Sequence, residues 1–259
     1  MSPLFEQPPA KDFTACIARI GEDFHIDLYS NNISRKFMLR GENDIYPKTE
    51  SSMKRFLTIE DRYMRSFDEA TPFIDFEDTF ADFHAERTGL TYEEGVGFLQ
   101  HYGFPTGLFD LSPSIDNARF FACHGSEDKP VGVIGVFPRE GVQAHFEVTD
   151  LSKHPFALRP RRQSAYAARA PAGIIDLKSD LCSAITGAKW YSFNKSEIDH
   201  DFVKNHLDWT YPSENELTSF FSDHFFQYFR EHWVQDESSK AGKFVIEKLN
   251  AIVQLYSHD

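Results

Sequence analysis

Three segments of the chain combine residue types that can bind or transform an anionic ligand. In the first, residues 37–42, Arg40 and Gly41 follow three apolar residues that predict a buried strand. An arginine at the end of such a strand needs an anionic partner, and a glycine beside it lets a ligand or a backbone come close. The pattern therefore predicts either a ligand contact by Arg40 or an internal salt bridge to Glu42 or Asp44.

The second segment, residues 100–114, places polar side chains at both ends of a short strand. A helix is expected to end at Gly103, and after the strand a new helix is expected to begin at Pro113. The polar residues at these connections are His101, Tyr102, Thr106, Asp110 and Ser112. A loop followed by a helix N-terminus is a plausible anion or ribose site. The alternative is that Asp110 only caps the following helix and that His101 only closes the preceding one.

The third segment, residues 151–175, is basic within an acidic chain. The whole sequence has 27 lysines and arginines against 40 acids, a net charge of −13, yet this segment holds no acid. Its cations are Lys153, Arg159, Arg161, Arg162 and Arg169. Because arginine is well suited to phosphate, the segment predicts an anionic ligand. The alternative is that these arginines neutralise the acidic remainder.

Several other classes of protein are excluded. No stretch approaches the ~20 apolar residues of a membrane span, and the first residues lack the basic start and apolar run of a secretory signal. Cys16, Cys123 and Cys182 have neither zinc-site spacing nor a disulfide framework. Serine-hydrolase, phosphate-loop and zinc-protease motifs are also missing from the sequence. We expect a cytoplasmic protein with no metal and no membrane partner.

These segments must be positioned by helices and strands, and the order of the expected helices and strands along the sequence predicts an α+β fold. The N-terminal half is expected to be helical, the centre to be a mixed or antiparallel β region, and the C-terminal part to be a helical layer. Two domains follow, an α+β domain over residues 1–195 and a helical extension over residues 196–259, packed on the same core.

Individual elements follow from hydrophobic periodicity and capping residues. Helices are expected from Phe13 to near Gly21, through much of 51–102 with a capping box at Thr91 and Glu94, after Ser196, through the aromatic stripe 220–229, and over 244–255. Strands are expected at 37–39, 106–110, 131–137, 144–148 and 189–193, with 131–137 central and 144–148 its neighbour.

Part of the chain resembles the FRG domain, a family named for its Phe-Arg-Gly motif. The resemblance rests on Arg40-Gly41-Glu42, on Gln-His-Tyr-Gly-Phe-Pro-Thr at 100–106 with Asp110, on Ala-Arg-Phe-Phe-Ala at 118–122, and on Arg-Arg-Gln-Ser-Ala-Tyr at 161–166. Three positions depart from the family pattern: Leu39 precedes Arg40-Gly41, Gly107 replaces the usual arginine, and Leu111-Ser112 replaces Trp-Thr. The resemblance implies a bacterial protein with a role in conflict or phage defence.

The same segments have a weaker resemblance to NAD-dependent ADP-ribosyltransferases, which implies a split-sheet β region and NAD as substrate. Arg40 would hold the NAD pyrophosphate or ribose, Phe109 would stack on nicotinamide, and Gln163 would bind the ribose hydroxyls. Gln163 stands where those enzymes carry a catalytic glutamate, so Asp110 or Glu147 would supply the carboxylate that stabilises the ribosyl cation.

Two hypotheses follow. In the first, the protein is an ADP-ribosyltransferase-type toxin or defence effector, or an NAD glycohydrolase, with a protein or nucleic-acid acceptor. In the second, it is a non-catalytic module that binds a nucleotide, a nucleic acid or a protein through residues 151–175. The candidate catalytic residues are Arg40, His101, Asp110 and Gln163, and the candidate ligand-binding residues are Gly41, Glu42, Tyr102, Thr106, Phe109, Ser112, Arg161 and Arg162.

Overall fold

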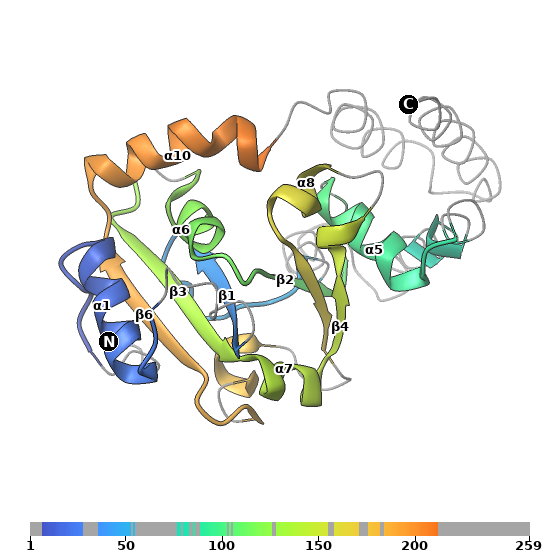
Figure 1. The fold of residues 1–259 in the computed structure, drawn as a ribbon, viewed down its shortest axis with the longest axis horizontal. Coiled ribbons are helices and arrows are strands. Elements are labelled where there is room, and N and C mark those ends of the chain that lie inside the picture. Colours follow the sequence, from blue (N-terminus) through green and yellow to red (C-terminus); the bar gives the residue numbers. More distant parts are fainter. Residues whose placement is uncertain are drawn as a thin grey trace, which may run out of the picture. The chain divides into compact units, whose positions relative to one another are not determined.

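The fold is a mixed α+β arrangement, seen in a computed structural model of the chain (Figure 1). The structure describes residues 7–27, 36–52, 54, 77–78, 80–82, 85, 89–102, 104, 106–125, 128–154, 158–170, 176–181 and 184–211. Most of the predicted helical stretch 55–90, the aromatic stripe 220–229 and the predicted helix 244–255 lie outside these residues. The predicted division at residue 195 therefore stays a prediction.

The described residues fall into two compact units. The first unit takes its residues from Met1–Glu50, Phe109–Lys153 and Arg159–Pro212, and the second from Ser51–Leu108 and His154–Leu158. The helices are α1 (Phe13–Phe24), α5 (Tyr92–His101), α6 (Ile115–Cys123), α7 (Arg139–His145), α8 (Leu158–Arg162) and α10 (Glu197–Thr210), with short helical turns η2 (Leu151–Lys153) and η3 (Leu177–Leu181). The strands are β1 (Phe37–Glu42), β2 (Leu108–Leu111), β3 (Val131–Pro138), β4 (Glu147–Asp150), β5 (Tyr166–Arg169) and β6 (Lys189–Asn194).

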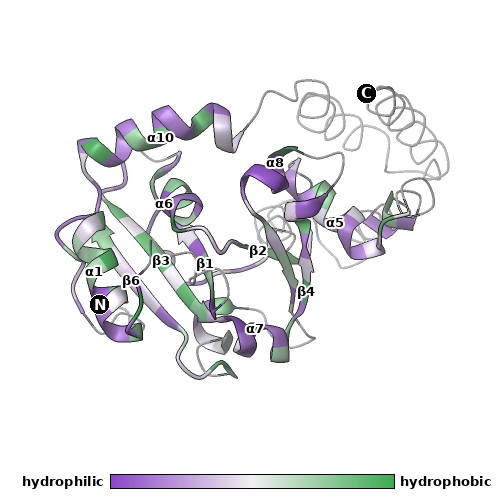
Figure 2. Cartoon of the chain, viewed as in Figure 1, coloured by the Kyte–Doolittle hydropathy of each residue, from purple (hydrophilic) through white to green (hydrophobic). Residues whose placement is uncertain are grey.

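The first sheet has the order β1-β3-β6, with antiparallel pairing on both sides of β3. Its central strand was predicted from a continuous β-branched, apolar run, and that prediction is confirmed. Figure 2 shows the apolar residues along β3. Arg40 lies opposite Gly135 and Gly41 opposite Ile134 in the register, so the first candidate segment runs along one edge of the sheet.

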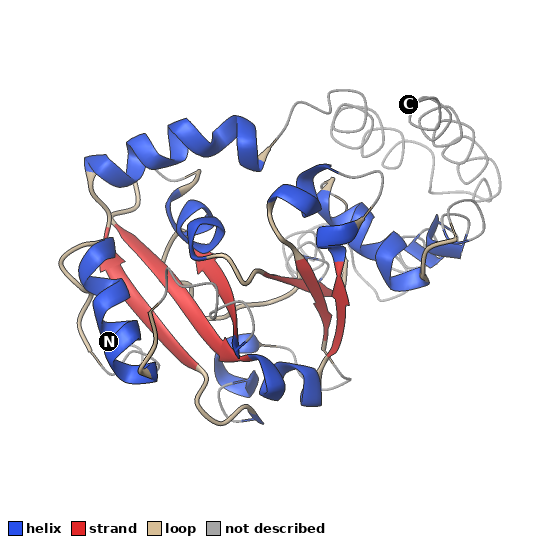
Figure 3. Cartoon of the chain, in the orientation of Figure 1, coloured by secondary structure: helices blue, strands red, loops and turns tan. Residues whose placement is uncertain are grey.

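The second sheet has the order β2-β5-β4 and stands apart from the first in Figure 3. The prediction that 144–148 is a strand beside 131–137 is wrong: α7 follows β3 at once, and β4 pairs with β5. Both edges of β3 are occupied by β1 and β6, so no place beside β3 remains for a further strand.

Side chains of β1 alternate between two cores, as a strand requires. Phe37 and Leu39 join α1 and α6 in one hydrophobic cluster, whereas Met38 joins a second cluster with residues of β2 and β5. By the same alternation, Gly41 belongs to the α6 face of β1. Arg40 and Glu42 belong to the face of Met38.

The helix ends show where local capping decides the boundary. Helix α1 continues past Gly21 to Phe24, and His25 then takes a left-handed conformation with φ of 53°. Helix α6 begins at Ile115 rather than at Pro113, because the Ser114 side chain accepts a hydrogen bond from the Asn117 N–H. The capping box that opens α5 and the helix after Ser196 are both confirmed.

Helix α10 is held to α6 inside the first unit. The Arg119 guanidinium forms an ion pair of 2.7 Å with the buried carboxylate of Asp199 and lies over the Phe13 and Phe202 rings. This contact fixes the N-terminal turn of α10 beside the second half of α6.

Candidate functional site

Gly41 is required by the packing of α6 on β1. A Cβ atom at this position would stand 1.9 Å from the Ala118 carbonyl oxygen and 2.7 Å from the Ala122 nitrogen. These two alanines are four residues apart on α6 and belong to the same family-like block as Gly41. The close approach foreseen at this glycine is therefore made by a helix backbone.

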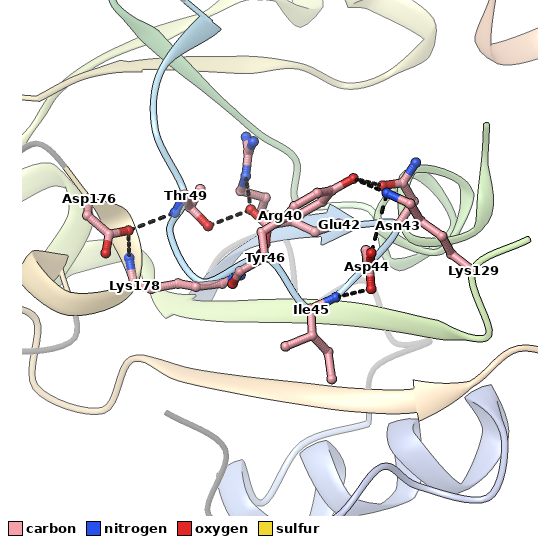
Figure 4. Close-up of polar contacts among 10 residues, drawn as sticks. All are labelled: Arg40, Glu42, Asn43, Asp44, Ile45, Tyr46, Thr49, Lys129, Asp176 and Lys178. Atoms are coloured by element: carbon pink, nitrogen blue, oxygen red, sulfur yellow. Dashed lines mark hydrogen bonds and ion pairs between the residues drawn. The ribbon is translucent and has the colours of Figure 1, made fainter. Parts of the chain in front are cut away.

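Arg40 is fixed by partners within the first unit, as Figure 4 shows for its ion pair. Its Nε lies 3.2 Å from Glu42 Oε1, and its Nη1 donates to the Asp110 carbonyl over 3.0 Å. The alternative of a structural salt bridge to Glu42 is thus confirmed. The contact with Asp110 also brings two candidate catalytic residues together at the backbone.

Glu42 is the centre of a buried charge network. Its carboxylate accepts a hydrogen bond of 2.6 Å from the Thr49 hydroxyl and lies 2.7 Å from the Lys178 Nζ. Lys178 is completely buried, and its Nζ also donates to the Tyr46 carbonyl and lies 5.0 Å from the centroid of the Trp190 ring. Glu42 therefore neutralises one buried cation and orients a second.

The end of β2 and the residue that follows it, Ser112, are tied to β1. Leu39 and Ser112 exchange two backbone hydrogen bonds of 2.7 and 2.8 Å. Asp110 does not cap α6, since Ser114 does, so that alternative for Asp110 is wrong. The Ser112 hydroxyl donates instead to the Gln163 carbonyl over 2.9 Å.

Gln163 is almost fully buried, with 3% of its surface exposed. Its Nε2 donates to the Thr210 carbonyl over 3.0 Å, and its own carbonyl accepts from Asn117 Nδ2 over 2.5 Å. Gln163 thus connects α6, α8 and α10. A role of its amide in binding ribose hydroxyls stays a prediction, and it would require the bond to Thr210 to open.

Phe109 is buried to the same degree, with 3% exposed, among Met38, Phe137 and other apolar residues of the second cluster. Its predicted stacking on a ligand would require the ring to leave this core. Glu147, the other candidate carboxylate, is exposed on β4.

His101, Tyr102 and Thr106 belong to the second unit. His101 is the last residue of α5, as expected if it closes that helix. Tyr102 is buried against the Phe98 ring, with 4.7 Å between centroids, and the buried Thr106 hydroxyl donates to the Gln100 side chain. Their predicted roles at a ligand stay predictions.

Arg162 lines a cavity in the first unit that has a volume of about 530 Å³. The lining comes from the start of α6, the end of α8 and the last turns of α10: Ser114, Asp116, Asn117, Phe120, Arg162, Ser164, Asn205, His206, Trp209 and Thr210. Cavities of ~300–1,000 Å³ are the usual size of small-molecule sites. The neighbouring Arg161 is exposed and is not part of this lining.

Arg161 and Arg162 have no acidic partner among the residues that the structure describes. The neutralisation alternative therefore does not account for these two arginines. Arg162 instead lies over the Trp209 ring, 4.9 Å from its centroid, and its Nη1 donates to the Asp208 carbonyl over 3.0 Å.

Tyr211 lies beside the cavity wall and is inert as an acid. Burial and, to a smaller extent, the Asp110 carboxylate raise the pKa of its phenol to about 12, and Arg159 opposes the shift. Arg159 lies 5.3 Å from the centroid of the Tyr211 ring, which also packs edge-on against Phe120. The phenol therefore stays protonated at neutral pH.

Metal and thiol chemistry find no support in the described parts of the chain. No group of three or more histidine, cysteine or acidic side chains there could hold a metal ion. Burial raises the pKa of both Cys16 and Cys123 to about 12, so neither thiol is a nucleophile at neutral pH. None of the described helices is long and apolar enough to cross a membrane.

The sequence analysis missed several residues of these two sites. Lys178, Thr49 and Asp176 complete the network around Glu42, where Asp176 accepts from the backbone N–H groups of Thr49 and Lys178. Trp209 and His206 complete the cavity. Only Trp209 carried a signal in the sequence, a large aromatic residue directly after an aspartate near a helix end.

Comparison with known proteins identifies one domain. Residues 35–130 match the family model of the FRG domain. In this structure the matched range contains β1, α5, β2 and α6. No curated protein and no solved structure matches the chain. The match covers three of the four blocks on which the resemblance rested, and the 161–166 block lies outside it.

Proposed function

The chain carries an FRG domain at residues 35–130, and from this premise we propose that it binds a nucleotide in the cavity beside Arg162. One observation carries the proposal. Arg162, from the acid-free segment 151–175, lines a cavity of about 530 Å³ next to an indole that is 56% exposed.

A nucleotide fits this combination of side chains. Two oxygens of its phosphate can accept parallel hydrogen bonds from a guanidinium, and its base presents a π-face to an exposed aromatic ring. Its sugar hydroxyls match the Ser114 and Ser164 hydroxyls that line the same cavity. A purely apolar ligand or a small inorganic anion would satisfy only part of this lining.

The direct test is calorimetric titration of the full chain with AMP, ADP-ribose and NAD. Arg162→Ala should weaken binding about tenfold or more, since a charge-assisted bidentate contact is lost. Arg161→Ala is the matched control, because it removes the same charge from the next residue outside the cavity. Equal losses for the two variants, or the absence of binding by all three nucleotides, would contradict the proposal.

A catalytic version of the proposal has a different supporting observation, the contact of Arg40 with the Asp110 carbonyl. In that version NAD is the substrate, and Asp110 or Glu147 stabilises the ribosyl cation as nicotinamide leaves. The test is nicotinamide release from NAD, with and without cell extract as a source of protein or nucleic-acid acceptors. Asp110→Asn should abolish release if Asp110 is the catalytic carboxylate, and Glu147→Gln should do so if Glu147 is.

A role as a bacterial toxin or phage-defence effector rests on the FRG domain alone. It predicts that induced expression slows the growth of a bacterial host or protects it from phage. The comparison of the wild-type chain with Arg162→Ala and Asp110→Asn would tell whether the binding site or the catalytic candidate carries such an effect. Unchanged growth and unchanged phage sensitivity would contradict this role.

A further inference from the structure

The lining of the cavity beside Arg162 is close to neutral in charge, and this property limits which class of nucleotide can bind. Building on the proposed function, we infer that the site takes a nucleoside monophosphate, with the phosphate at Arg162 and the base against Trp209. Nucleoside di- and triphosphates and dinucleotides are disfavoured by charge and should bind more weakly than a monophosphate.

The charge argument uses the side chains of the lining. Arg162 is the one lysine or arginine among them, and Asp116 is the one acid. A single guanidinium pairs with a single phosphate through two parallel hydrogen bonds. A second phosphate would find no further arginine or lysine in this lining and would stand in the field of Asp116, which costs free energy.

Two contacts fix the position of Arg162, and they use only part of its hydrogen-bonding capacity. One N–H group donates to the Asp208 carbonyl, and the guanidinium is stacked over Trp209. A guanidinium has five N–H donors. The other four have no partner among the residues that the structure describes, so a phosphate meets an arginine whose position is already fixed.

Trp209 provides the surface for the base. Its side chain lies near the end of α10 and is 56% exposed although it lines the cavity. Stacking of a base on an aromatic ring contributes strongly to binding and tolerates every base. Recognition of the base must therefore come from the polar side chains beside the ring.

His206 and Asn205 are those side chains. His206 Nδ1 lies 2.8 Å from the Phe202 carbonyl, and the imidazole is stacked on the Phe202 ring with 4.0 Å between centroids. For the neutral imidazole we assign the proton to Nδ1 from this contact, and Nε2 is then an acceptor. An acceptor beside an amide matches a base edge that carries both a donor and an acceptor.

The backbone of Ser164 adopts a conformation that favours glycine, yet the residue at this position carries a side chain. Its φ of 46° lies in the left-handed region that glycine normally occupies at the end of a helix. The residue follows α8 and lines the cavity. A serine at this position gives the lining a hydroxyl that a glycine would not.

The test is a calorimetric series with adenosine, AMP, ADP, NAD, GMP and inorganic phosphate on the full chain. AMP or GMP should bind tightest, ADP and NAD about tenfold or more weaker, and inorganic phosphate weakest. Trp209→Ala should weaken AMP binding about tenfold. Ile198→Ala is its control, since Ile198 is an exposed apolar residue of the same helix outside the cavity.

Asp116→Asn tests the charge argument by itself. Without the carboxylate, ADP should gain affinity relative to AMP by several-fold, because the second phosphate no longer faces a negative charge. Affinity that rises with the number of phosphates in the wild-type chain would overturn the inference and leave the proposed function standing. If no nucleotide binds, the proposed function itself fails.

Discussion

Arg40 and Arg162 lie in the same unit, and their surroundings are opposite. Arg40 follows an apolar strand and directs its guanidinium to Glu42 and to the Asp110 carbonyl. Arg162 ends a short helix, has no acidic partner in the described structure and lines a cavity. The arginine of the family motif thus makes internal contacts, and the arginine of the basic segment has N–H donors without a partner among the residues that the structure describes.

The difference indicates that the residues of a sequence motif can serve the packing of the fold rather than the binding of a ligand. Arg40, Gly41 and Glu42 together fix β1 to three neighbours: the β2 segment, α6 and the turn at Lys178. A ligand site needs the reverse, side chains whose positions are fixed but whose donors remain unpaired. The cavity beside Arg162 has this property, so the predictions below separate a structural region from a binding region.

The largest effect is expected from Lys178→Met. The substitution leaves the Glu42 carboxylate buried without the cation 2.7 Å away, and breaking a buried pair in this way costs about 3–5 kcal/mol. Urea denaturation followed by circular dichroism measures the loss. The comparable change in the cavity, Arg162→Met, should alter the free energy of unfolding by less than about 1 kcal/mol, because this arginine has no buried charged partner in the described part of the chain.

The double variant Glu42→Gln with Lys178→Met is the control for the network. It removes both charges, so it should recover part of the stability lost by Lys178→Met alone. If the single variant were as stable as the wild type, the network would not hold β1, and the contrast between the two arginines would lose its basis.

A smaller effect is expected from Gly41→Ala. The added methyl group would meet the α6 backbone at 1.9 Å, so the helix must move away from β1, at a cost of about 1–3 kcal/mol or more. The control is Gly107→Ala, where a Cβ meets nothing within 4 Å and the stability should change little. The midpoint of thermal unfolding gives both values. Equal midpoints for the two variants would show that α6 accommodates a side chain at this position.

Much of the first sheet could be predicted from the sequence because its signals are local. The β-branched run 131–137 predicts a central strand wherever it occurs, and the Arg40–Glu42 pair was one of two stated alternatives. The partner of Glu42 could not be predicted, since Lys178 is far away in the sequence and only the fold brings its Nζ to the carboxylate. No periodicity carries that information.

The candidate site was predicted in part, and for a related reason. The basic segment pointed to Arg162, but not to the choice between Arg162 and Arg161, which depends on how α8 faces α6 and α10. Trp209 and His206 reach the cavity only because Arg119 and Gln163 hold α10 in place. Gly41 carried a usable signal: Ala118 and Ala122, four apart on a helix, are small residues of the kind that permit close packing.

The smallest effect is expected at Ser164, where stability and binding should change in opposite directions. Ser164→Gly removes the left-handed strain of a non-glycine residue and should stabilise the protein by up to about 1 kcal/mol. The same change deletes one hydroxyl of the cavity, so affinity for AMP should fall several-fold, as for a hydrogen bond worth about 0.5–1.5 kcal/mol. Denaturation and calorimetry on one preparation measure both. A variant that gained stability and kept full affinity would mean that the serine serves no ligand, and the cavity would then lose the feature that most clearly sets it apart from the structural region at Arg40.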